Sequence, residues 1–338
     1  MERLTINLGS RKSNILIGER LENLSKYLPD TRVIIITDEN VYHLYRHLFP
    51  GYEAIVIGTG EKNKTLETTQ YIYEQLVEKG LDRSGYVVGI GGGIVCDIAG
   101  FAASTYMRGV RFGFVSTTLL SQVDASIGGK NGVNLHGYKN MIGVFNQPDF
   151  VICDFNLLKS LPPDEFRTGF AEIIKHACIQ NRSMFEFIED NHEKALENDY
   201  DTIYKLVYDS LIIKGGIVEK DERESGERRK LNFGHTYGHA IEKIAGISHG
   251  EAISQGMAIA SGLSLKKGYL SEKENNRILE LLKKFKLPTE VTAAKKEIFE
   301  VLGKDKKREK DDMNFVLLHD IGKAIIEKIN INELEHLI

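Results

Sequence analysis

Short, continuous runs of apolar residues recur in the first half of the chain, and each one ends in a polar or glycine-rich turn. Residues 33–37 are such a run, residues 54–57 are a second, and residues 86–90 lead directly into a glycine cluster. Unbroken β-branched runs of this length are typical of strands buried on both faces of a parallel sheet. Because helical segments at residues 41–48 and up to Lys79 separate the runs, the sequence predicts a doubly wound α/β domain.

Further strands extend this predicted domain. Residues 4–8 and 14–17 flank a turn-like Gly-Ser-Arg-Lys segment and predict an opening hairpin. Residues 112–115 and 151–153 predict two more buried strands. Between them, residues 121–143 are polar and rich in glycine, and we interpret them as a long functional loop outside the core.

Pro162 and Pro163 mark the predicted domain boundary, because prolines end the regular elements that precede them. Almost everything after them has helical periodicity. The predicted helices cover residues 164–179, 182–191, 201–219, 231–245, 251–267, 272–285 and 297–303, and a strand-like segment follows at residues 314–318. The sequence therefore predicts an α/β domain over residues 1–160 and an α-helical domain over residues 161–338.

The composition excludes several classes of function. Lysine and arginine number 44 against 48 aspartate and glutamate residues, so no net field draws the chain to nucleic acid or membrane. The three cysteines form no Cys-x-x-Cys pair, which fits a reducing cytoplasm. The first residues are charged where a secretory signal needs an apolar core, and no apolar run reaches the roughly 18 residues of a membrane span. We expect a cytoplasmic protein.

The glycine cluster at residues 89–100 reads GIGGGIVCDIAG and lies between a predicted strand and a helix of small residues. Glycines there let the backbone approach a ligand and turn helix N–H groups toward phosphate, so we interpret the cluster as a diphosphate cradle. The strict G-x-G-x-x-G fingerprint fails, because Ile94 stands at the last glycine position. The alternative is that the glycines only permit tight packing. Asp97 could bond a ribose or nicotinamide, or complement the helix dipole.

Three histidines lie within residues 231–257. His235 and His239 are four residues apart and share a face of a predicted helix, which is a metal-ligand spacing. His249 follows an Ala-Gly break, so a second helix can return its imidazole to the first pair. The segment differs from the His-Glu-x-x-His of zinc proteases, since Thr236 stands at the glutamate position. The alternative is surface or capping chemistry.

A divalent metal bound by these histidines would need an anionic ligand. Glu172 is the best candidate, because it lies in a predicted helix with Lys175 and His176 on the same polar stripe. Zinc with imidazole and carboxylate ligands and one open position is the catalytic pattern. The residues therefore predict a catalytic metal site, in which spacing alone pairs His235 with His239.

Taken together, these motifs resemble the 3-dehydroquinate synthase family of the sugar-phosphate cyclase superfamily. The matching stretches are GEKNKT at residues 60–65, the glycine turn with Asp97, STTLLSQVDASIGGKNGVN, GYKNMIG, AEIIKHA, RRKLNFGHTYGHAIE and HGEAISQGM. They occur in order from about residue 30 to the end of the chain. The resemblance implies a Rossmann-like NAD-binding domain, an α-helical metal- and substrate-binding domain, and an active site in the cleft between them.

The resemblance also implies ligands residue by residue. It gives Glu172, His235 and His249 as metal ligands, and it makes His239 a substrate contact beside the metal. The residues implied to bind NAD are Asp38, Asn40, Glu61, Lys64, Gly92, Gly93, Asp97, Thr117, Thr118, Leu120, Asp124 and Lys139. The residues implied to contact substrate are Arg108, Lys130, Asn140, Lys175, Lys214, Arg228, Asn232, His239 and one of Lys306 and Lys307, with Lys307 preferred.

The implied reaction converts 3-deoxy-D-arabino-heptulosonate 7-phosphate into 3-dehydroquinate and phosphate, in the shikimate pathway. NAD+ is reduced and regenerated within each cycle, and zinc, or cobalt in its place, activates the substrate's hydroxyl groups. The phosphate is expected to be met by Lys130, Asn140, Lys175 and Arg108, and the carboxylate by Lys214, Arg228, Asn232 and Lys307. The resemblance also implies a homodimer.

Three other functions share part of this pattern. Related cyclases such as 2-deoxy-scyllo-inosose synthase act on substrates without a carboxylate and replace the arginine and asparagine that stand here as Arg228 and Asn232. Metal-dependent polyol dehydrogenases related to glycerol dehydrogenase share the glycine turn and the histidine spacing, but they release NADH. A nucleotide-binding regulator that had lost its chemistry would lack some of the expected ligands, and none is missing from this sequence.

Overall fold

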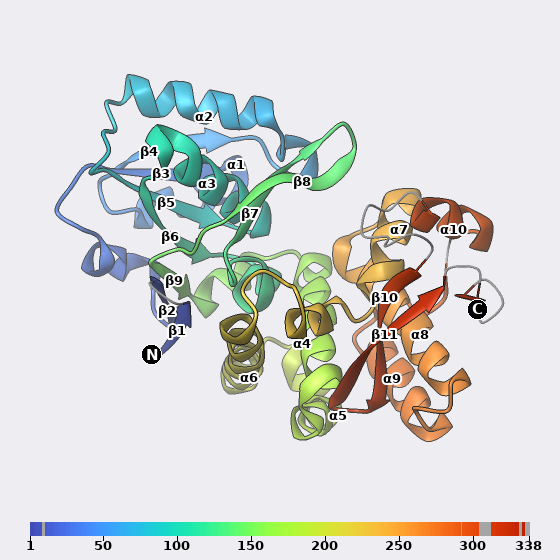
Figure 1. Ribbon diagram of the computed structural model, residues 1–338. Helices are drawn as coiled ribbons and strands as arrows, with labels where there is room; N and C mark the ends of the chain where they lie inside the picture. The colour runs from blue at the N-terminus through green and yellow to red at the C-terminus, as the bar shows by residue number, and fades with distance from the viewer. Residues whose placement is uncertain (9–10, 292, 304–311, 331–332, 335–338) are drawn as a thin grey trace. The chain divides into compact units, whose positions relative to one another are not determined.

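The computed structural model contains two compact units, Met1–Leu161 and Pro162–Ile338, each with a hydrophobic core of its own (Figure 1). It describes residues 1–8, 11–291, 293–303, 312–330 and 333–334. Within these ranges, no helix combines the length and the apolar character needed to cross a membrane.

Unit 1 is built on a seven-stranded sheet with the strand order β1-β2-β9-β6-β5-β3-β4. Its strands are β1 Glu2–Leu8, β2 Arg11–Ile17, β3 Val33–Asp38, β4 Glu53–Ile57, β5 Tyr86–Gly91, β6 Arg111–Ser116 and β9 Phe150–Cys153. β1 pairs antiparallel with β2, and all other neighbours pair parallel. The parallel α/β sheet and the opening hairpin predicted from the sequence are confirmed.

Helices cover both faces of this sheet, which is why its central strands are continuously apolar. The helices are α1 Glu39–Tyr45, α2 Leu66–Glu78 and α3 Gly93–Thr105, with shorter turns η1 Leu21–Tyr27, η2 Arg46–Leu48, η3 Glu61–Asn63, η4 Tyr106–Arg108 and η6 Phe155–Ser160. On one face, Val88 shares a core cluster with Val41 of α1. On the other face, α3 comes so close that a Cβ at Gly89 would lie 3.0 Å from the Cβ of Ala99. Residues facing either layer must therefore be apolar or small.

The winding of the sheet reverses between β3 and β5. From β3 the chain adds β4 on one side, and then β5, β6 and β9 on the other. Asp38 ends β3, Gly91 ends β5 and Ser116 ends β6, so these residues share the carboxyl edge of the parallel strands. Open α/β sheets bind ligands outside this edge, at the point of reversal. This edge is the expected ligand site of unit 1.

The prediction that residues 121–143 form a loop outside the core is wrong for their secondary structure and for residues 121–133, which are mostly buried, whereas residues 136–143 are mostly exposed, as predicted. The segment starts with a π-helical turn, η5 Ser121–Ala125, and continues into an antiparallel hairpin of β7 Lys130–Leu135 and β8 Tyr138–Phe145. Gln122 is fully buried because its amide donates hydrogen bonds to the carbonyl oxygens of Ser116 and Asp154. Polar side chains that find partners inside the unit explain why polarity misled the interpretation.

Unit 2 is mainly helical, as predicted. Its elements are α4 Pro163–Gln180, α5 Arg182–Leu196, α6 Tyr200–Lys220, η7 Glu227–Asn232, α7 His235–Ala245, α8 His249–Lys266, α9 Glu272–Lys284, α10 Lys295–Gly303, β10 Asp312–Asp320 and β11 Lys323–Asn330. Two details differ from the predictions. The strand-like segment belongs to β10, which pairs antiparallel with the unpredicted β11. The helix expected over residues 231–245 begins only at His235, because the preceding Gly234 adopts a left-handed φ of +78°.

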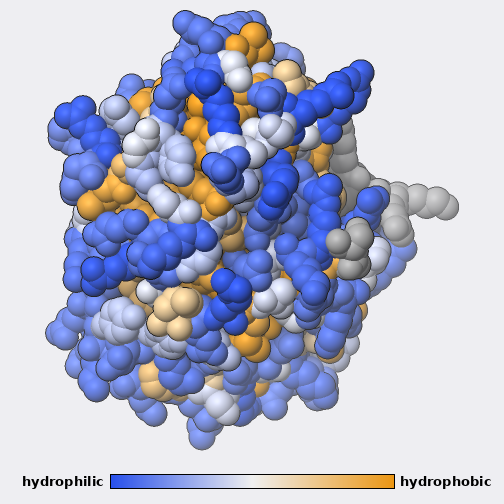
Figure 2. Space-filling view, turned by 90° about the vertical axis from the view of Figure 1, so that its left-hand side faces the viewer, coloured by the Kyte–Doolittle hydropathy of each residue, from blue (hydrophilic) through white to orange (hydrophobic). Residues whose placement is uncertain are grey.

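The face of the molecule drawn in Figure 2 is mainly hydrophilic, and hydrophobic residues show between hydrophilic ones in separate small patches. Scattered apolar residues are normal on a protein surface and do not by themselves mark a binding site. The small patches on this face therefore do not indicate a binding site.

Candidate functional site

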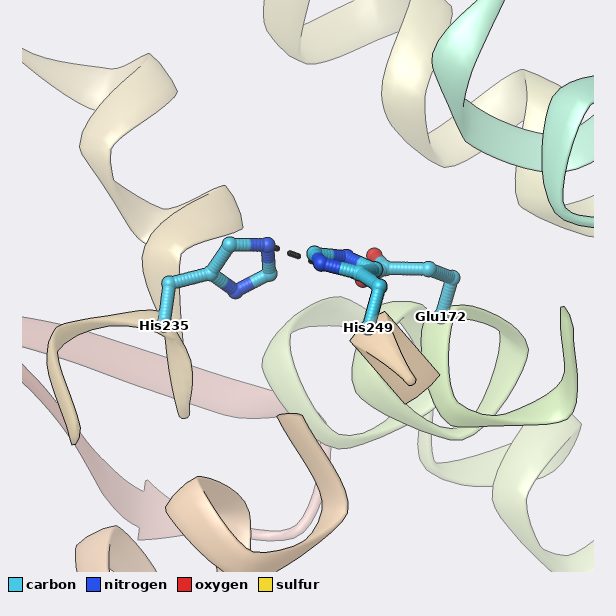
Figure 3. A group of neighbouring side chains, drawn as sticks. All are labelled: Glu172, His235 and His249. Atoms are coloured by element: carbon cyan, nitrogen blue, oxygen red, sulfur yellow. Dashed lines mark hydrogen bonds and ion pairs between the residues drawn. The ribbon is translucent and has the colours of Figure 1, made fainter. Parts of the chain in front are cut away.

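Three predicted metal ligands converge inside unit 2. Glu172 lies in the middle of α4, while His235 and His249 are the first residues of α7 and α8. Their side chains point toward one another from these three helices (Figure 3). One ligand atom from each residue can be chosen so that all lie within 4.8 Å of one another.

The backbones of α7 and α8 fix the spacing of the two histidines. A Cβ added to Gly256 of α8 would overlap the carbonyl oxygen of Gly234, and one added to Gly238 of α7 would lie 3.1 Å from the carbonyl oxygen of Ala252. The main chains of the two helices therefore approach closely, and the side chains of Ile253 and Met257 pack against Gly238 and Gly234 at the same contact. This contact leaves little freedom to the positions of His235 and His249.

The distances between the ligand atoms suit a tetrahedral metal ion. The Nε2 atoms of His235 and His249 lie 3.6 and 3.2 Å from Oε1 of Glu172. Metal–ligand bonds of about 2.0–2.1 Å around zinc give a tetrahedral edge of about 3.4 Å. Two imidazole nitrogens and one carboxylate oxygen are also the donor set of catalytic zinc and of cobalt. The three residues fit the predicted metal in both spacing and chemistry.

The charges around this group are unequal. Lys175 forms an ion pair with Glu172 in the interior, where the two side chains are 1% and 0% exposed. Burial and the Lys175 ammonium lower the pKa of His235 well below its usual value, so His235 is neutral, as a metal ligand must be. Burial also lowers the pKa of His249, but the neighbouring carboxylates of Glu172 and Glu242 outweigh it and raise that pKa to about 9. His249 is thus protonated at neutral pH.

The second nitrogen of each imidazole faces an acceptor. Nδ1 of His235 lies 3.2 Å from the carbonyl oxygen of Phe233, to which only an N–H can donate. Nδ1 of His249 lies 3.7 Å from Oε2 of Glu242. Both rings therefore turn Nε2 toward Glu172. The ring of His239 lies 5.2 Å from that of His235, between centroids, at the border of the group.

The predicted carboxylate-binding residues Arg228 and Asn232 lie on η7, directly before His235. The backbone N–H of Arg228 donates to Oδ2 of Asp221 at 3.0 Å, and its guanidinium donates to the carbonyl oxygen of Glu222. The side chain of Arg228 is buried, as is that of Lys214 on α6. The loop therefore holds Arg228 in place, and both cations are kept out of water.

In unit 1, several predicted cofactor residues form a polar network. Nζ of Lys64 donates to Asp97 on α3 and, at 2.5 Å, to Oδ1 of Asn140 on β8. Nearby, Glu61 accepts a hydrogen bond of 2.8 Å from Asn134 and faces Lys139 at 3.8 Å. Residues 60–65 and the tip of the β7–β8 hairpin are thus joined by side chains.

The remaining predicted cofactor residues lie at or just after the carboxyl edge of the sheet. They are Asp38 and Asn40 after β3, Gly92 and Gly93 after β5, and Thr117, Thr118, Leu120 and Asp124 after β6. Burial raises the pKa of Asp38, whose carboxylate caps α1 by accepting from the N–H of Val41. A Cβ at Gly93 would lie 2.8 Å from the Cβ of Ala125. Tight packing therefore accounts for Gly93 by itself, and its phosphate role stays a prediction.

The comparisons with known proteins agree with this arrangement. A family model described as 3-dehydroquinate synthase N-terminal matches residues 54–168, and one described as 3-dehydroquinate synthase C-terminal matches residues 169–308. The chain belongs to the 3-dehydroquinate synthase family. The family predicted from the sequence motifs is confirmed.

Relatives named 3-dehydroquinate synthase match nearly the whole chain. The protein from Thermoanaerobacter pseudethanolicus is 42% identical, with 99% of both chains covered. The protein from Pelobacter propionicus is 39% identical, with 99% of this chain and 98% of the relative covered. Membership of the 3-dehydroquinate synthase family therefore extends over both units.

Solved structures share the fold. A 2-deoxy-scyllo-inosose synthase complexed with carbaglucose-6-phosphate, NAD+ and Co2+ has a TM-score of 0.88 at 27% identity, with 99% of both chains covered. A 2-epi-5-epi-valiolone synthase from Streptomyces hygroscopicus, with NAD+ and Zn2+ bound, has a TM-score of 0.89 at 25% identity, covering 100% of this chain and 98% of its own. A probable glycerol dehydrogenase from Sinorhizobium meliloti, at 14% identity and a TM-score of 0.68 with 99% and 97% covered, shares the fold alone.

Not every residue implied by the family resemblance joins these groups. Arg108 lies on η4, directly after the C-terminal end of α3. Lys130 opens β7 opposite Phe145, whereas Asn140 lies nearer the turn of the same hairpin, where its N–H donates to the side chain of Asn134. Lys307 lies outside the described residues.

Three residues in these groups were missed by the sequence reasoning. Glu242 faces His249, Asn134 links Glu61 to Asn140, and Asp221 holds the loop before Arg228. Glu242 carried a readable signal, because it stands seven residues after His235 and shares its helix face. Asn134 and Asp221 carried none, since their partners come from sequence-distant segments or from a tight loop.

Proposed function

We propose that this member of the 3-dehydroquinate synthase family converts 3-deoxy-D-arabino-heptulosonate 7-phosphate into 3-dehydroquinate and inorganic phosphate. The observation that carries the proposal is the convergence of Glu172, His235 and His249 at tetrahedral spacing. The enzyme is a phosphate-eliminating lyase with a catalytic NAD and a divalent metal, and unit 1 supplies the NAD site while unit 2 supplies the metal site.

Glu172, His235 and His249 would hold the metal through Oε1 and the two Nε2 atoms. When bound, zinc or cobalt polarises the hydroxyl groups at C4 and C5 of the substrate and lowers their pKa. Neutral His235 is ready to bind, whereas His249 must first lose a proton from its Nε2 atom, since its pKa is raised to about 9. That proton leaves with metal uptake.

Buried cations of unit 2 would grip the substrate's carboxylate. Arg228 and Lys214 are both held in the interior, and a planar guanidinium matches a carboxylate with two parallel hydrogen bonds. Asn232, on the same turn as Arg228, adds an amide donor. These residues would hold the substrate's ring in one orientation at the metal site of unit 2.

NAD+ held by the residues at the carboxyl ends of β3, β5 and β6 would supply the oxidant for C5 and, once reduced, the hydride for the later reduction. The ketone at C5 makes the neighbouring C6 proton acidic. The substrate's own phosphate, bound by Lys175 together with Lys130, Asn140 and Arg108, would take that proton as it leaves. Ring opening and an intramolecular aldol addition then close the carbocycle. No NADH is released.

The same proposal includes a homodimer in the cytoplasm. The homodimer rests on the family resemblance alone. The cytoplasmic location is supported by Cys96, Cys153 and Cys178, which are all free and buried, as thiols of a reducing compartment are. Burial raises the pKa of each thiol, so none is activated for redox chemistry.

A phosphate-release assay tests the function. With the heptulosonate phosphate, NAD+ and zinc, we expect one phosphate per molecule of 3-dehydroquinate formed and no increase in NADH absorbance. A chelator, or removal of NAD+, should stop the release. Net NADH production from a simple polyol, with no phosphate released, would replace the proposal by a polyol dehydrogenase activity.

A second assay separates the related cyclases. Their substrates lack a carboxylate, whereas Arg228 and Asn232 are present here. Offered a sugar phosphate without a carboxylate, the enzyme should release phosphate at least about 100-fold more slowly, since a buried charged group would remain unpaired. Equal rates on both substrates would contradict the assignment of Arg228.

A further inference from the structure

We propose that Glu242 is a positioning residue of the metal centre, which orients His249 through its Nδ1 atom while Nε2 serves the metal. The inference rests on the proposed function, because it takes the group of Glu172, His235 and His249 as the metal site. It concerns a residue outside that ligand set.

The two nitrogens of His249 face two different carboxylates. Nε2 lies 3.2 Å from Oε1 of Glu172, and Nδ1 lies 3.7 Å from Oε2 of Glu242. Because the two nitrogens stand on opposite sides of a ring carbon, a group at Nδ1 cannot share the ion that Nε2 binds. The 3.7 Å separation is an ion-pair distance, and a shift of less than 1 Å gives a hydrogen bond of ordinary length.

The two histidines are held by unlike acceptors. Nδ1 of His235 donates to a backbone carbonyl, that of Phe233, which any sequence would provide. Nδ1 of His249 faces a carboxylate that depends on one side chain. A carboxylate behind a ligating histidine fixes its tautomer and makes the ring a stronger donor. Of the two histidines, His249 is therefore the one whose second nitrogen faces a side-chain carboxylate. His249 is the first residue of α8, and its side chain is 30% exposed.

Helix α7 delivers Glu242 to this place. His235, His239 and Glu242 stand at positions i, i+4 and i+7 and so share one helix face. The main-chain contact between α7 and α8 at Gly238 and Gly256 keeps that face against the start of α8. Glu242 is 7% exposed, which keeps its charge close to the ring and largely out of water.

Zinc affinity measured without turnover tests the inference. In competition with a chromophoric chelator, Glu242→Gln should bind zinc about 10-fold more weakly and Glu242→Ala up to about 100-fold more weakly than the wild type. The matched control is Glu19→Gln in unit 1, since Glu19 is also 7% exposed and hydrogen-bonded to Asn23 and Tyr27. It should keep wild-type zinc affinity even if it unfolds more readily.

A spectroscopic readout separates positioning from general stability. The visible absorption of the Co2+-loaded protein reports the ligand field, so its bands should shift in Glu242→Gln and stay unchanged in Glu19→Gln. If Glu242→Ala fails to fold, the isosteric Glu242→Gln still gives the answer. At saturating zinc, Glu242→Gln should regain most of its turnover, with the loss confined to the zinc concentration required.

Three results would overturn the inference. The first is wild-type zinc affinity and Co2+ bands in both Glu242 variants. The second is a stoichiometry of two ions in the wild type that falls to one in Glu242→Gln, which would make Glu242 a ligand with His239 instead, since those two and His249 also have ligand atoms within 4.8 Å. The third is a wild-type protein that binds no zinc, a result that would remove the metal from the proposed function as well.

Discussion

The metal group of unit 2 and the polar network of unit 1 both pair a lysine with an acid, but in different surroundings. Lys175 and Glu172 are 1% and 0% exposed, whereas Lys64 and Asp97 are 6% and 18% exposed. The first pair lies within one helix, α4, whose main chain at Thr168 packs closely against Gly250 of α8. The second bridges the sheet edge to a hairpin tip through Asn140. A ligand can rearrange the pair of Lys64 and Asp97 by taking over its hydrogen bonds. The pair of Lys175 and Glu172 is almost fully enclosed and therefore less free to rearrange.

This difference separates the tasks of the two regions. A metal centre needs ligands held at fixed distances before the ion arrives, and the interior of unit 2 supplies such rigidity. A cofactor is held by many weak contacts. The hydrogen-bond network of unit 1 suits such a ligand, because its side chains can exchange their hydrogen bonds to each other for hydrogen bonds to the cofactor. Mutations of the buried pair should therefore damage stability as well as metal binding, whereas mutations of the network in unit 1 should mainly weaken cofactor binding.

The largest effect should come from Glu172→Gln. It leaves the Lys175 charge in the interior without its counter-charge, which costs about 3–5 kcal/mol of unfolding free energy, and it removes a metal ligand. Urea denaturation and zinc titration measure the two losses. The double variant Glu172→Gln/Lys175→Met should recover most of the stability but none of the zinc binding. A single variant as stable as the wild type would break the comparison.

The contact between α7 and α8 offers the next test. Gly256→Ala places a methyl group against the carbonyl oxygen of Gly234 and should cost about 1–3 kcal/mol of stability and weaken zinc binding. Gly262→Ala, in the same helix, meets nothing within 4 Å and should stabilise by up to about 1 kcal/mol. Thermal unfolding of the Gly256→Ala and Gly262→Ala variants measures the two changes in stability. Equal effects of the two variants would show that the helices are not in contact there.

Arg228→Ala tests whether the carboxylate grip belongs with the buried charges of unit 2. Loss of a charge-assisted contact of about 1.5–3 kcal/mol should raise KM about 10- to 100-fold. Arg223→Ala, an exposed arginine in the same loop, is the control and should leave KM unchanged. Steady-state kinetics of phosphate release measure both. Wild-type turnover of Arg228→Ala at low substrate would show that the carboxylate binds elsewhere.

Lys64→Met probes the exchangeable network of unit 1. By removing the contact to Asp97 and Asn140, it should weaken NAD+ binding about 10-fold, the loss of about 1.4 kcal/mol. The exposed Lys62→Met is the control. Quenching of protein fluorescence by NAD+ gives both affinities. Zinc affinity should not change, and a loss of zinc binding in Lys64→Met would contradict the separation of tasks.

The smallest expected signal is a proton. His249 has its pKa raised to about 9 and is protonated at neutral pH, so zinc must displace a proton to bind. Zinc affinity should therefore rise with pH, about tenfold per unit, and level off near pH 9. Calorimetry at pH 7.5 in buffers of different ionisation enthalpy should show about one proton released per zinc. Release of none would mean that His249 is neutral before the metal arrives.

The sequence predicted the framework of both units well, because that framework depends on local patterns. The strands at residues 33–37 and 86–90 and most helices of unit 2 follow from apolar periodicity. The candidate metal group of Glu172, His235, His239 and His249 was predicted from residue types and spacing, and the family resemblance then selected His249 over His239 as a ligand. No local pattern gives the geometry, since Glu172 lies 63 positions before His235 in the chain.

The misses have physical causes of the same kind. β11 reads KAIIEKIN, which has no strict alternation and becomes a strand only by pairing with β10. The helix start at His235 depends on the left-handed φ of Gly234, a backbone state that the neighbouring residues do not reveal. Residues 121–143 seemed too polar for a core. The buried Gln122 shows why the inference failed, since its amide donates to the carbonyl oxygens of Ser116 in β6 and of Asp154, which the local sequence does not reveal.

The glycine seam between α7 and α8 has a consequence for protein engineering. Since the main chains of α7 and α8 approach so closely there, the spacing of the two imidazoles is set largely within residues 234–257. That helical hairpin can be transplanted as a single cassette onto another bundle, with a carboxylate supplied by the host. Sliding one helix by a single residue would displace an imidazole by about 1.5 Å. A recipient scaffold must therefore preserve the register of α7 against α8 as well as their sequence.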